Sequence, residues 1–252
     1  MGRVVQILGT AGNVGLTPDV PGAERWCSNN PRVYRIRFPQ AMKTYTRWFN
    51  MHSHRHITTT YPSGYKWYQN QDGTRPIYLR DAVDPTIPGS VVFPGPLLMD
   101  YFANQGQQER FFTFSGSWFV ALVTYEHLEV APVERVELWG IEMKRDRQWD
   151  HERPAMHYWM GRAEVAGIHF LIPEGVNLCR DRVGQSDIAA RLRTAENTGA
   201  AVDLRDAVIT REDPQEFETI HYLIGRCRQH GIPVLLPEGI CVAPKLYGYE
   251  TT

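Results

Sequence analysis

The chain has 252 residues, of which 42% are hydrophobic and 22% charged, and its formal net charge is −1. This length suits one large α/β domain, or one domain with a small appendage. The balanced charge argues against electrostatic binding of nucleic acid over a large surface, although not against binding at a local basic patch. The four cysteines lack C-x-x-C spacing, so neither a zinc ribbon nor a disulfide framework is indicated. No signal peptide follows Met1 and no apolar run reaches the ~20 residues of a membrane span, which predicts a cytoplasmic protein.

The N-terminus predicts a buried strand over residues 4–8, followed by a glycine-rich loop with glycines at positions 9, 12 and 15. Glycines let backbone N–H groups approach a phosphate or ribose. The spacing is not G-x-G-x-x-G, so a tight turn is an equal alternative to a nucleotide loop. A second short strand over residues 23–28 ends at Asn29, which either reads a base or ribose edge or simply turns the chain.

His52, His54 and His56 follow at a spacing of two, which would place them on one face of a strand. Imidazole is a common metal ligand, but no nearby carboxylate completes a ligand set, so a polar loop facing solvent or substrate is favoured over a metal site. The aromatic-rich residues 61–68 are interpreted as a loop: a lid, an acceptor platform or a plain surface loop.

The middle of the chain predicts a strand over residues 76–80, an extended proline-rich segment to residue 96, and a short helix over 97–105. Ser115 or Ser117 caps a buried helix that runs to about residue 128, and its Ser-Gly start is a candidate anion site. A strand over 135–141 then ends at Glu142 and a highly charged loop. At the carboxyl edge of a parallel sheet such a loop is either catalytic or simply solvated.

Residues 157–175 recur 64 positions later as residues 221–239, and ten positions coincide without gaps. Each copy predicts a helix that ends at a glycine, then an apolar strand and a Pro-Glu-Gly turn. We expect two helix–strand units of one sheet or a duplicated edge, with helices between them. The Pro-Glu-Gly turns would line one edge, although duplicated packing geometry is the favoured interpretation.

Several short motifs in this order suggest a family. They are Gly9-Thr10-Ala11, Trp26 to Asn29, Ser115-Gly116 before a helix, Gly140-Ile141-Glu142, Arg153-Pro154, and Tyr247-Gly248-Tyr249-Glu250. The order over roughly residues 4–175 plus the tail resembles the bacterial family 42 sialyltransferases and the motility-accessory-factor group. It also resembles uncharacterised phage-encoded proteins.

The resemblance implies a nucleotide-sugar site. It assigns the nucleotide to Gly9, Thr10, Gly12, Asn13 and Asn29, and its phosphate or ribose to Ser115 and Gly116. Such enzymes use a histidine to deprotonate the acceptor hydroxyl, for which His151 is the first choice and His157 the second. The loop after Glu142 lacks the family's tyrosines, so an arginine would neutralise the leaving phosphate instead: Arg145, Arg147 or Arg153.

We therefore expect a Rossmann-like α/β protein with a mostly parallel sheet flanked by helices and a C-terminal duplicated helix–strand unit. Residues 1–180 would form the nucleotide-binding core, and residues 181–252 a helical insert and the repeated unit of the same domain. The expected activity is metal-independent glycosyl transfer from a CMP- or UDP-linked sugar, in a phage protein of the host cytoplasm that forms a homo-oligomer.

Two alternatives stay open. The first is an enzyme that modifies nucleic acid or cleaves an N-glycosidic bond, with Glu142 or Glu152 activating water and the 61–68 segment stacking on bases. The second is a non-catalytic nucleotide-binding or virion-associated module, because one scaffold carries many chemistries.

Overall fold

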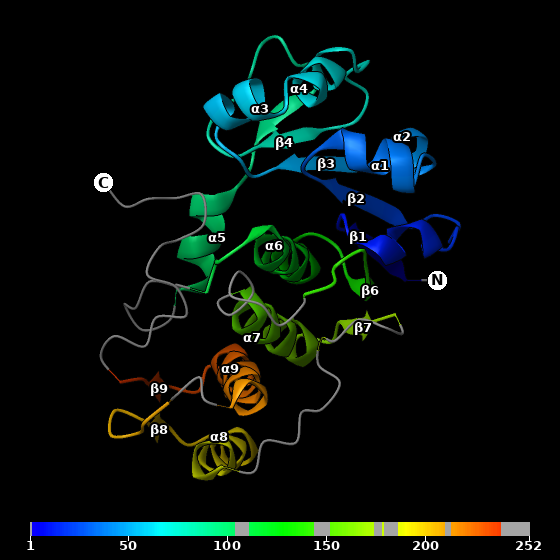
Figure 1. Cartoon of the computed structure of the whole chain (residues 1–252). Coiled ribbons are helices and arrows are strands. Elements are labelled where there is room, and N and C mark those ends of the chain that lie inside the picture. The colour runs from blue at the N-terminus through cyan, green and yellow to red at the C-terminus, as the bar shows by residue number, and fades with distance from the viewer. Residues whose placement is uncertain are drawn as a thin grey trace. The chain divides into compact units, whose positions relative to one another are not determined.

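The computed structural model describes residues 2–103, 111–143, 152–173, 178, 186–209 and 213–237 (Figure 1). The chain divides into two compact units. The first comprises residues 1–96, 133–142 and 171–174, and the second residues 97–132, 143–170 and 175–252.

A parallel sheet organises the first unit. Its elements in chain order are β1 (Arg3–Leu8), the 3₁₀ helix η1 (Gly12–Leu16), β2 (Glu24–Ser28), α1 (Pro31–Arg37), α2 (Ala41–Thr44), β3 (Arg47–Asn50), α3 (His54–Thr60), α4 (Pro62–Gln69), β4 (Ile77–Leu79), β5 (Ser90–Val92) and β6 (Val133–Trp139). With β7 (His169–Leu171), the strands form a seven-stranded sheet in the order β5-β4-β3-β2-β1-β6-β7. All strands are parallel, which confirms the predicted Rossmann-like class.

The strands are largely buried, as is usual for parallel sheets, although β1, β2 and β6 also bury the polar side chains of Gln6, Arg25 and Glu137. From β1 to β5 each strand lies beside its predecessor, and right-handed crossovers therefore place α1 to α4 on the same face. The core beneath these helices joins Leu8, Cys27, Trp48 and Ile77 of the strands to Tyr34, Ala41, Ile57 and Tyr68 of the helices. β6 then returns to the other side of β1, so the direction of winding reverses between β1 and β6.

The second unit is mainly helical. It contains α5 (Gly95–Phe102), which begins at the boundary, then α6 (Ser115–Glu129), α7 (Glu152–Val165), α8 (Asp187–Thr198), β8 (Val202–Asp203), α9 (Pro214–Gln229) and β9 (Val234–Leu235). The strands β8 and β9 pair in parallel as a separate two-stranded sheet. No helix in the described part of the chain is long and apolar enough to cross a membrane.

The repeat forms two helix–strand units, α7–β7 and α9–β9, as predicted. The alternative that both strands belong to one sheet is wrong, because β7 lies in the large sheet and β9 pairs with β8. The two helices cross reciprocally at equivalent glycines. A Cβ on Gly161 would lie 2.3 Å from the carbonyl oxygen of Tyr222, and one on Gly225 would lie 2.1 Å from that of Tyr158. The shared glycine and tyrosine therefore maintain a close helix crossing. The Pro-Glu-Gly turns extend beyond the described residues.

Two local predictions are wrong. Residues 61–68 lie largely in helix α4, where Pro62 occupies the first turn and Tyr68 is buried in the core. His54 and His56 lie on helix α3 and not on a strand, because the Ser53 side chain accepts a hydrogen bond from the backbone N–H of His56 and caps the helix. In addition, the proline-rich segment contains the short strand β5.

Candidate functional site

The loops after β1 and β6 meet where the winding of the sheet reverses, the position at which open α/β sheets bind ligands. Gly9 and Gly140 make this close approach possible. A Cβ on Gly9 would lie 2.2 Å from the carbonyl oxygen of Gly140, and Gly140 itself has a left-handed φ of 68°. Their primary role is therefore to let the two loops pack together.

Hydrogen bonds between these loops determine which backbone groups face outward. The N–H groups of Gly9 and Ala11 donate to the carbonyl oxygens of Trp139 and Gly140, and the Asn13 side chain accepts from the N–H of Gly140. Among the described residues, no acceptor is found for the N–H groups of Thr10 and Gly12. The N–H groups of Thr10 and Gly12 are thus among the groups of the loop that remain available to a ligand.

The two glycines of this loop should respond differently to substitution. We expect Gly9→Ala to destabilise the protein by about 1–3 kcal/mol, because the added Cβ forces the β1 and β6 loops apart. Gly12→Ala should change stability by less than about 0.5 kcal/mol, since Gly12 is exposed and its nearest neighbour, Glu142 Oε1, would lie 3.7 Å from the new Cβ. Urea unfolding of both variants measures the difference, and equal effects would contradict it. Gly12, not Gly9, is therefore the position at which to test ligand binding.

Asn29 ends β2, next to β1 on the same edge of the sheet. It adopts a left-handed φ of 60°, which asparagine tolerates better than most residues. Its carbonyl oxygen accepts hydrogen bonds from Trp48 Nε1 and the Tyr68 hydroxyl, whereas its side-chain Oδ1 is buried and accepts none from the described residues. A buried unsatisfied oxygen at this edge is consistent with the predicted contact to a ligand.

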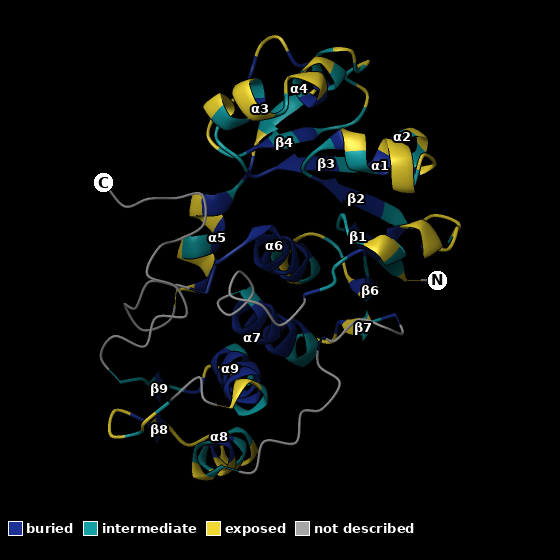
Figure 2. Ribbon diagram, viewed as in Figure 1, coloured by how far each residue is buried: buried dark blue, intermediate teal, exposed yellow. Residues whose placement is uncertain are grey.

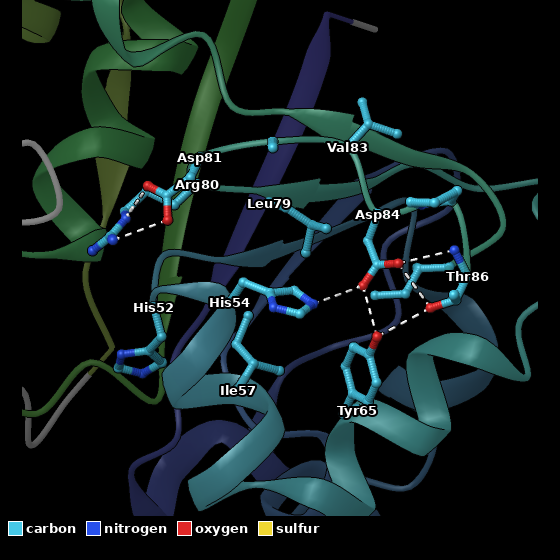
Figure 3. A pocket seen from close by; sticks show the side chains of 13 residues that line it. His52, His54, Ile57, Tyr65, Leu79, Arg80, Asp81, Val83, Asp84 and Thr86 are labelled. Atoms are coloured by element: carbon cyan, nitrogen blue, oxygen red, sulfur yellow. Dashed lines mark hydrogen bonds and ion pairs between the residues drawn. The ribbon is translucent and has the colours of Figure 1, made fainter.

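A cavity of about 420 Å³ lies farther along the edge, where β3 and β4 end (Figure 3). Its lining includes His52 and His54 after β3, Tyr65 on α4, and the segment from Leu79 to Ile87 after β4. The volume falls in the range of small-molecule pockets. With a strand spacing of about 4.8 Å, β3 lies roughly 10 Å from β1. One ligand of nucleotide-sugar size could therefore reach from the loop after β1 to this cavity.

His54 and Asp84 form the chemically most specific arrangement in this cavity. Asp84 is buried, and its Oδ2 lies 3.1 Å from His54 Nε2 and accepts a 2.8 Å hydrogen bond from the Tyr65 hydroxyl (Figure 3). Its Oδ1 accepts hydrogen bonds from the backbone N–H and hydroxyl of Thr86. Burial alone would raise the pKa of Asp84, but the hydrogen bonds from Thr86, Tyr65 and His54 outweigh it, so this pKa is lowered.

Asp84 thereby orients the imidazole of His54. Because an ionised carboxylate can only accept hydrogen bonds, Nε2 of His54 must carry the proton shared with Asp84. Nδ1 of the neutral ring then carries the lone pair. The His54 side chain is 61% exposed, so it remains accessible to a substrate. A buried carboxylate that orients an accessible imidazole is the arrangement that general-base catalysis needs.

The imidazole rings of His52 and His56 lie close together at the cavity, with ring centroids 4.7 Å apart. Burial, followed by the neighbouring His56 and Arg80, lowers the pKa of His52 to about 4. His54 does not belong to this pair and contacts Asp84 instead. Within the described ranges, no group of three or more His, Cys, Asp or Glu side chains is placed to hold a metal ion.

His52 makes stability depend on pH in a defined direction. In the unfolded chain it binds a proton near pH 6.5, whereas in the folded chain it binds one only near pH 4. The stability contributed by neutral His52 is present above pH 6.5 and is lost as the pH falls toward 4. Between pH 7.5 and 5, wild type should lose about 1 kcal/mol more stability than His52→Gln, after allowance for partial exposure. Urea unfolding at both pH values tests this, and parallel losses would contradict it.

Much of the predicted charged loop lies outside the described residues, including His151, Arg145 and Arg147, and the roles expected of them stay predictions. Glu142 is described. It follows β6 and approaches Gly12, so it belongs to the loops at the reversal of the sheet. A role for Glu142 next to a bound ligand therefore stays a prediction that this placement supports.

The next predicted residues belong to helix α7 of the second unit. Glu152 lies in its first turn. Arg153 is 3% exposed, and its guanidinium donates to both carboxylate oxygens of Glu218, at 2.6 and 2.9 Å, and to the carbonyl oxygen of Met143. His157 is 2% exposed, with Nδ1 3.7 Å from Glu218 Oε2. This geometry gives Arg153 a structural role and leaves His157 little access to a substrate.

The Ser-Gly start of α6 is also enclosed. Ser115 is buried, and a Cβ on Gly116 would lie against the ring of Phe114. The N-cap residue is Phe114, whose side chain makes no capping hydrogen bond, and the Ser117 hydroxyl donates to the carbonyl oxygen of Phe114. The prediction that Ser115 or Ser117 caps the helix is therefore wrong, because both residues lie inside α6. The anion site predicted at Ser115 and Gly116 therefore has no open face in this geometry, and phosphate or ribose binding there stays a prediction.

No protein-family model, no curated protein and no solved structure matches this chain. The resemblance to sialyltransferase-like proteins therefore stays a hypothesis. The function has to be argued from the arrangement of side chains at the carboxyl edge of the sheet.

Sequence reasoning missed the pairing of His54 with Asp84 and Tyr65. The three residues are separated by up to 30 positions, and only the crossover from β3 through α3 and α4 to β4 brings them together. One local signal was present. Asp84-Pro85-Thr86 is a turn in which the carboxylate accepts hydrogen bonds from Thr86, and it follows a strand.

Proposed function

We propose that this chain is a metal-independent group-transfer enzyme of the glycosyltransferase type. His54 is the base that deprotonates an acceptor hydroxyl, and the nucleotide of a CMP- or UDP-linked sugar binds at the β1 and β6 loops. The observation that carries the proposal is the Asp84–His54 pair in the cavity after β3 and β4. A hydroxyl is a poor nucleophile without such a base.

Three features support the position of the donor. The Rossmann-like sheet reverses its winding at β1 and β6. The N–H groups of Thr10 and Gly12 have no acceptor among the described residues, and the buried Oδ1 of Asn29, which follows the neighbouring strand β2, accepts no hydrogen bond from them. Backbone N–H groups and an amide oxygen suit the phosphate and the ribose or base of a nucleotide, respectively.

A ligand screen tests the proposal. The melting temperature is measured with CMP, UDP, CMP-N-acetylneuraminate, UDP-glucose and UDP-N-acetylglucosamine, and a ligand at about 100 times its Kd should add roughly 2.7 kcal/mol. We expect one of these nucleotides or nucleotide sugars to stabilise wild type, and Gly12→Leu to remove this stabilisation while the unliganded protein melts as wild type does. Chromatography of the stabilising nucleotide sugar then detects release of its nucleotide.

The outcomes separate the alternatives. Stabilisation without nucleotide release, in the presence of added sugar acceptors, would favour a non-catalytic nucleotide-binding module. Failure of the whole nucleotide panel would overturn the donor assignment.

A further inference from the structure

The near-zero net charge conceals a strong separation of charge along the chain. Residues 25–71 contain no Asp or Glu and eight of the 27 Lys and Arg residues. These eight are Arg25, Arg32, Arg35, Arg37, Lys43, Arg47, Arg55 and Lys66. All 28 acidic residues therefore lie elsewhere. A charge distribution of this kind creates a local positive potential in a protein that is neutral overall.

The fold gathers this segment on one surface. Residues 31–69 contain α1 to α4, the layer that covers one face of the sheet, with α1 packed on α2 and α4, and α3 packed on α4. The inner side of the layer belongs to the core. Its outer side is exposed along all four helices (Figure 2). Six cations lie at these exposed positions. Arg37 donates a hydrogen bond to the carbonyl oxygen of Thr10, and the other five are Arg32, Arg35, Lys43, Arg55 and Lys66. We call these five residues the cationic face.

Among the described residues, no carboxylate forms an ion pair with these cations. None of the five forms an ion pair with another described residue, whereas most other arginines of the described chain do. The acids nearest in sequence are already engaged. Glu24 binds Arg3 and Arg47, Asp72 accepts from Thr74, and Asp84 is held by His54, Tyr65 and Thr86. The positive charge of the cationic face is therefore available to an anionic binding partner.

The chemistry of the face identifies the class of partner. Three of its five cations are arginines, whose planar guanidinium groups bind phosphate oxygens in a bidentate manner. Neutral donors that commonly contact nucleic-acid phosphates are exposed between them, at Thr59, Thr60 and Ser63. Ile36 is the large apolar side chain exposed on these helices, so the layer offers little for insertion into a lipid bilayer.

We propose that the cationic face binds the phosphodiester backbone of a nucleic acid, independently of base sequence. This inference is separate from the group-transfer chemistry and does not depend on it. Each cation that neutralises a phosphate releases a counterion, so binding should weaken steeply as salt rises, by about 0.9 in the slope of log affinity against log salt per phosphate on duplex DNA.

The test is fluorescence anisotropy of the full chain with labelled single-stranded DNA, duplex DNA and RNA of about 20 nucleotides, between roughly 50 and 200 mM salt. Two double variants are compared with wild type: Arg32→Gln with Arg35→Gln, and Arg55→Gln with Lys66→Gln. The matched control is Arg191→Gln with Arg205→Gln, which removes the same charge from arginines that already pair with Asp203 or Asp206. All substitutions are at the surface, and melting temperatures verify that the variants fold.

We expect wild type and the control to bind DNA or RNA, and each test variant to lower the salt slope by about two. Preference for single strands, duplex or RNA then names the form of nucleic acid. The proposal is overturned if wild type binds none of the three, or if both test variants bind as the control does. Binding to phosphatidylserine vesicles without binding to nucleic acid would also overturn it and assign the face to a membrane surface.

Discussion

Replacing Arg153 by methionine is expected to lower the free energy of unfolding by about 3–5 kcal/mol. Methionine keeps the length and apolar stem of the side chain but removes the guanidinium that donates twice to Glu218 and once to the carbonyl oxygen of Met143. Glu218 is 8% exposed, so its carboxylate would remain in a buried place without its strongest partner. The loss is measured by urea unfolding.

A double variant separates the charge from the shape of the side chain. Arg153→Met with Glu218→Leu removes both ions and leaves apolar groups of similar volume, a change that is often neutral or stabilising at buried pairs. We expect it to recover most of the stability lost in Arg153→Met. If the single variant unfolds at the same urea concentration as wild type, or if the double variant is no more stable than the single, the buried pair is not what stabilises the contact between α7 and α9.

The sequence around Arg153, one of the three arginines predicted to neutralise a leaving phosphate, gives no sign of this buried pair. Arg153 follows a run of charged residues, and the local pattern resembled a solvated or catalytic loop. Its partner is 65 positions away on another helix. A buried ion pair between distant helices leaves no signal in the sequence around either residue, so burial could not be predicted there.

The strands and the buried helix α6 were predictable because their signals are local. Residues 4–8, 76–80 and 135–141 are short apolar runs bounded by turn residues or charges, and each overlaps a strand of the sheet. The helix that begins at Ser115 was likewise evident from its long apolar run. Parallel order then followed from the alternation of strands and helices.

Helices α1, α3 and α4 were harder, because they are only seven or eight residues long. Such short helices depend on caps and tertiary packing more than on intrinsic propensity. Asn30 and Ser53 provide the caps of α1 and α3, and Tyr34, Ile57 and Tyr68 attach the three helices to the sheet. Because helix α3 was not predicted, the contact between His54 and Asp84 could not be predicted either. Because the layer of helices α1 to α4 was not predicted, the cationic face could not be predicted from the sequence.

The sequence predicts a site at the carboxyl edge of the sheet, but it does not indicate the residues that the cavity after β3 and β4 brings together. The Gly-rich loop and Asn29 do lie at the carboxyl edge of the sheet, as the order of strands implied. The histidine that pairs with a carboxylate in the cavity, however, is His54, which is part of a His-x-His-x-His pattern in the sequence. That spacing suggests metal ligands on a strand. In the structure, His54 and His56 lie on helix α3 and their rings point to different partners. His56 lies beside His52, which precedes the helix, and His54 contacts Asp84.

The second large effect concerns His54. His54→Gln should lower the rate of nucleotide release from the nucleotide sugar that the screen identifies by about 10²–10⁴-fold, the usual contribution of a general base. Glutamine can still donate a hydrogen bond to Asp84, so the cavity should keep its shape, but it cannot take up a proton. The matched control is His56→Gln, because His56 lies on the same helix and makes no contact with Asp84.

Asp84 acts through His54 as a positioning residue, and its variant needs a readout that loss of structure would not produce. Asp84→Asn replaces the carboxylate that orients the His54 ring by an amide, so kcat should fall while KM for the nucleotide sugar and the melting temperature stay close to those of wild type. Unchanged kcat in Asp84→Asn, or equal losses of activity in His54→Gln and His56→Gln, would contradict the assignment of His54 as the base.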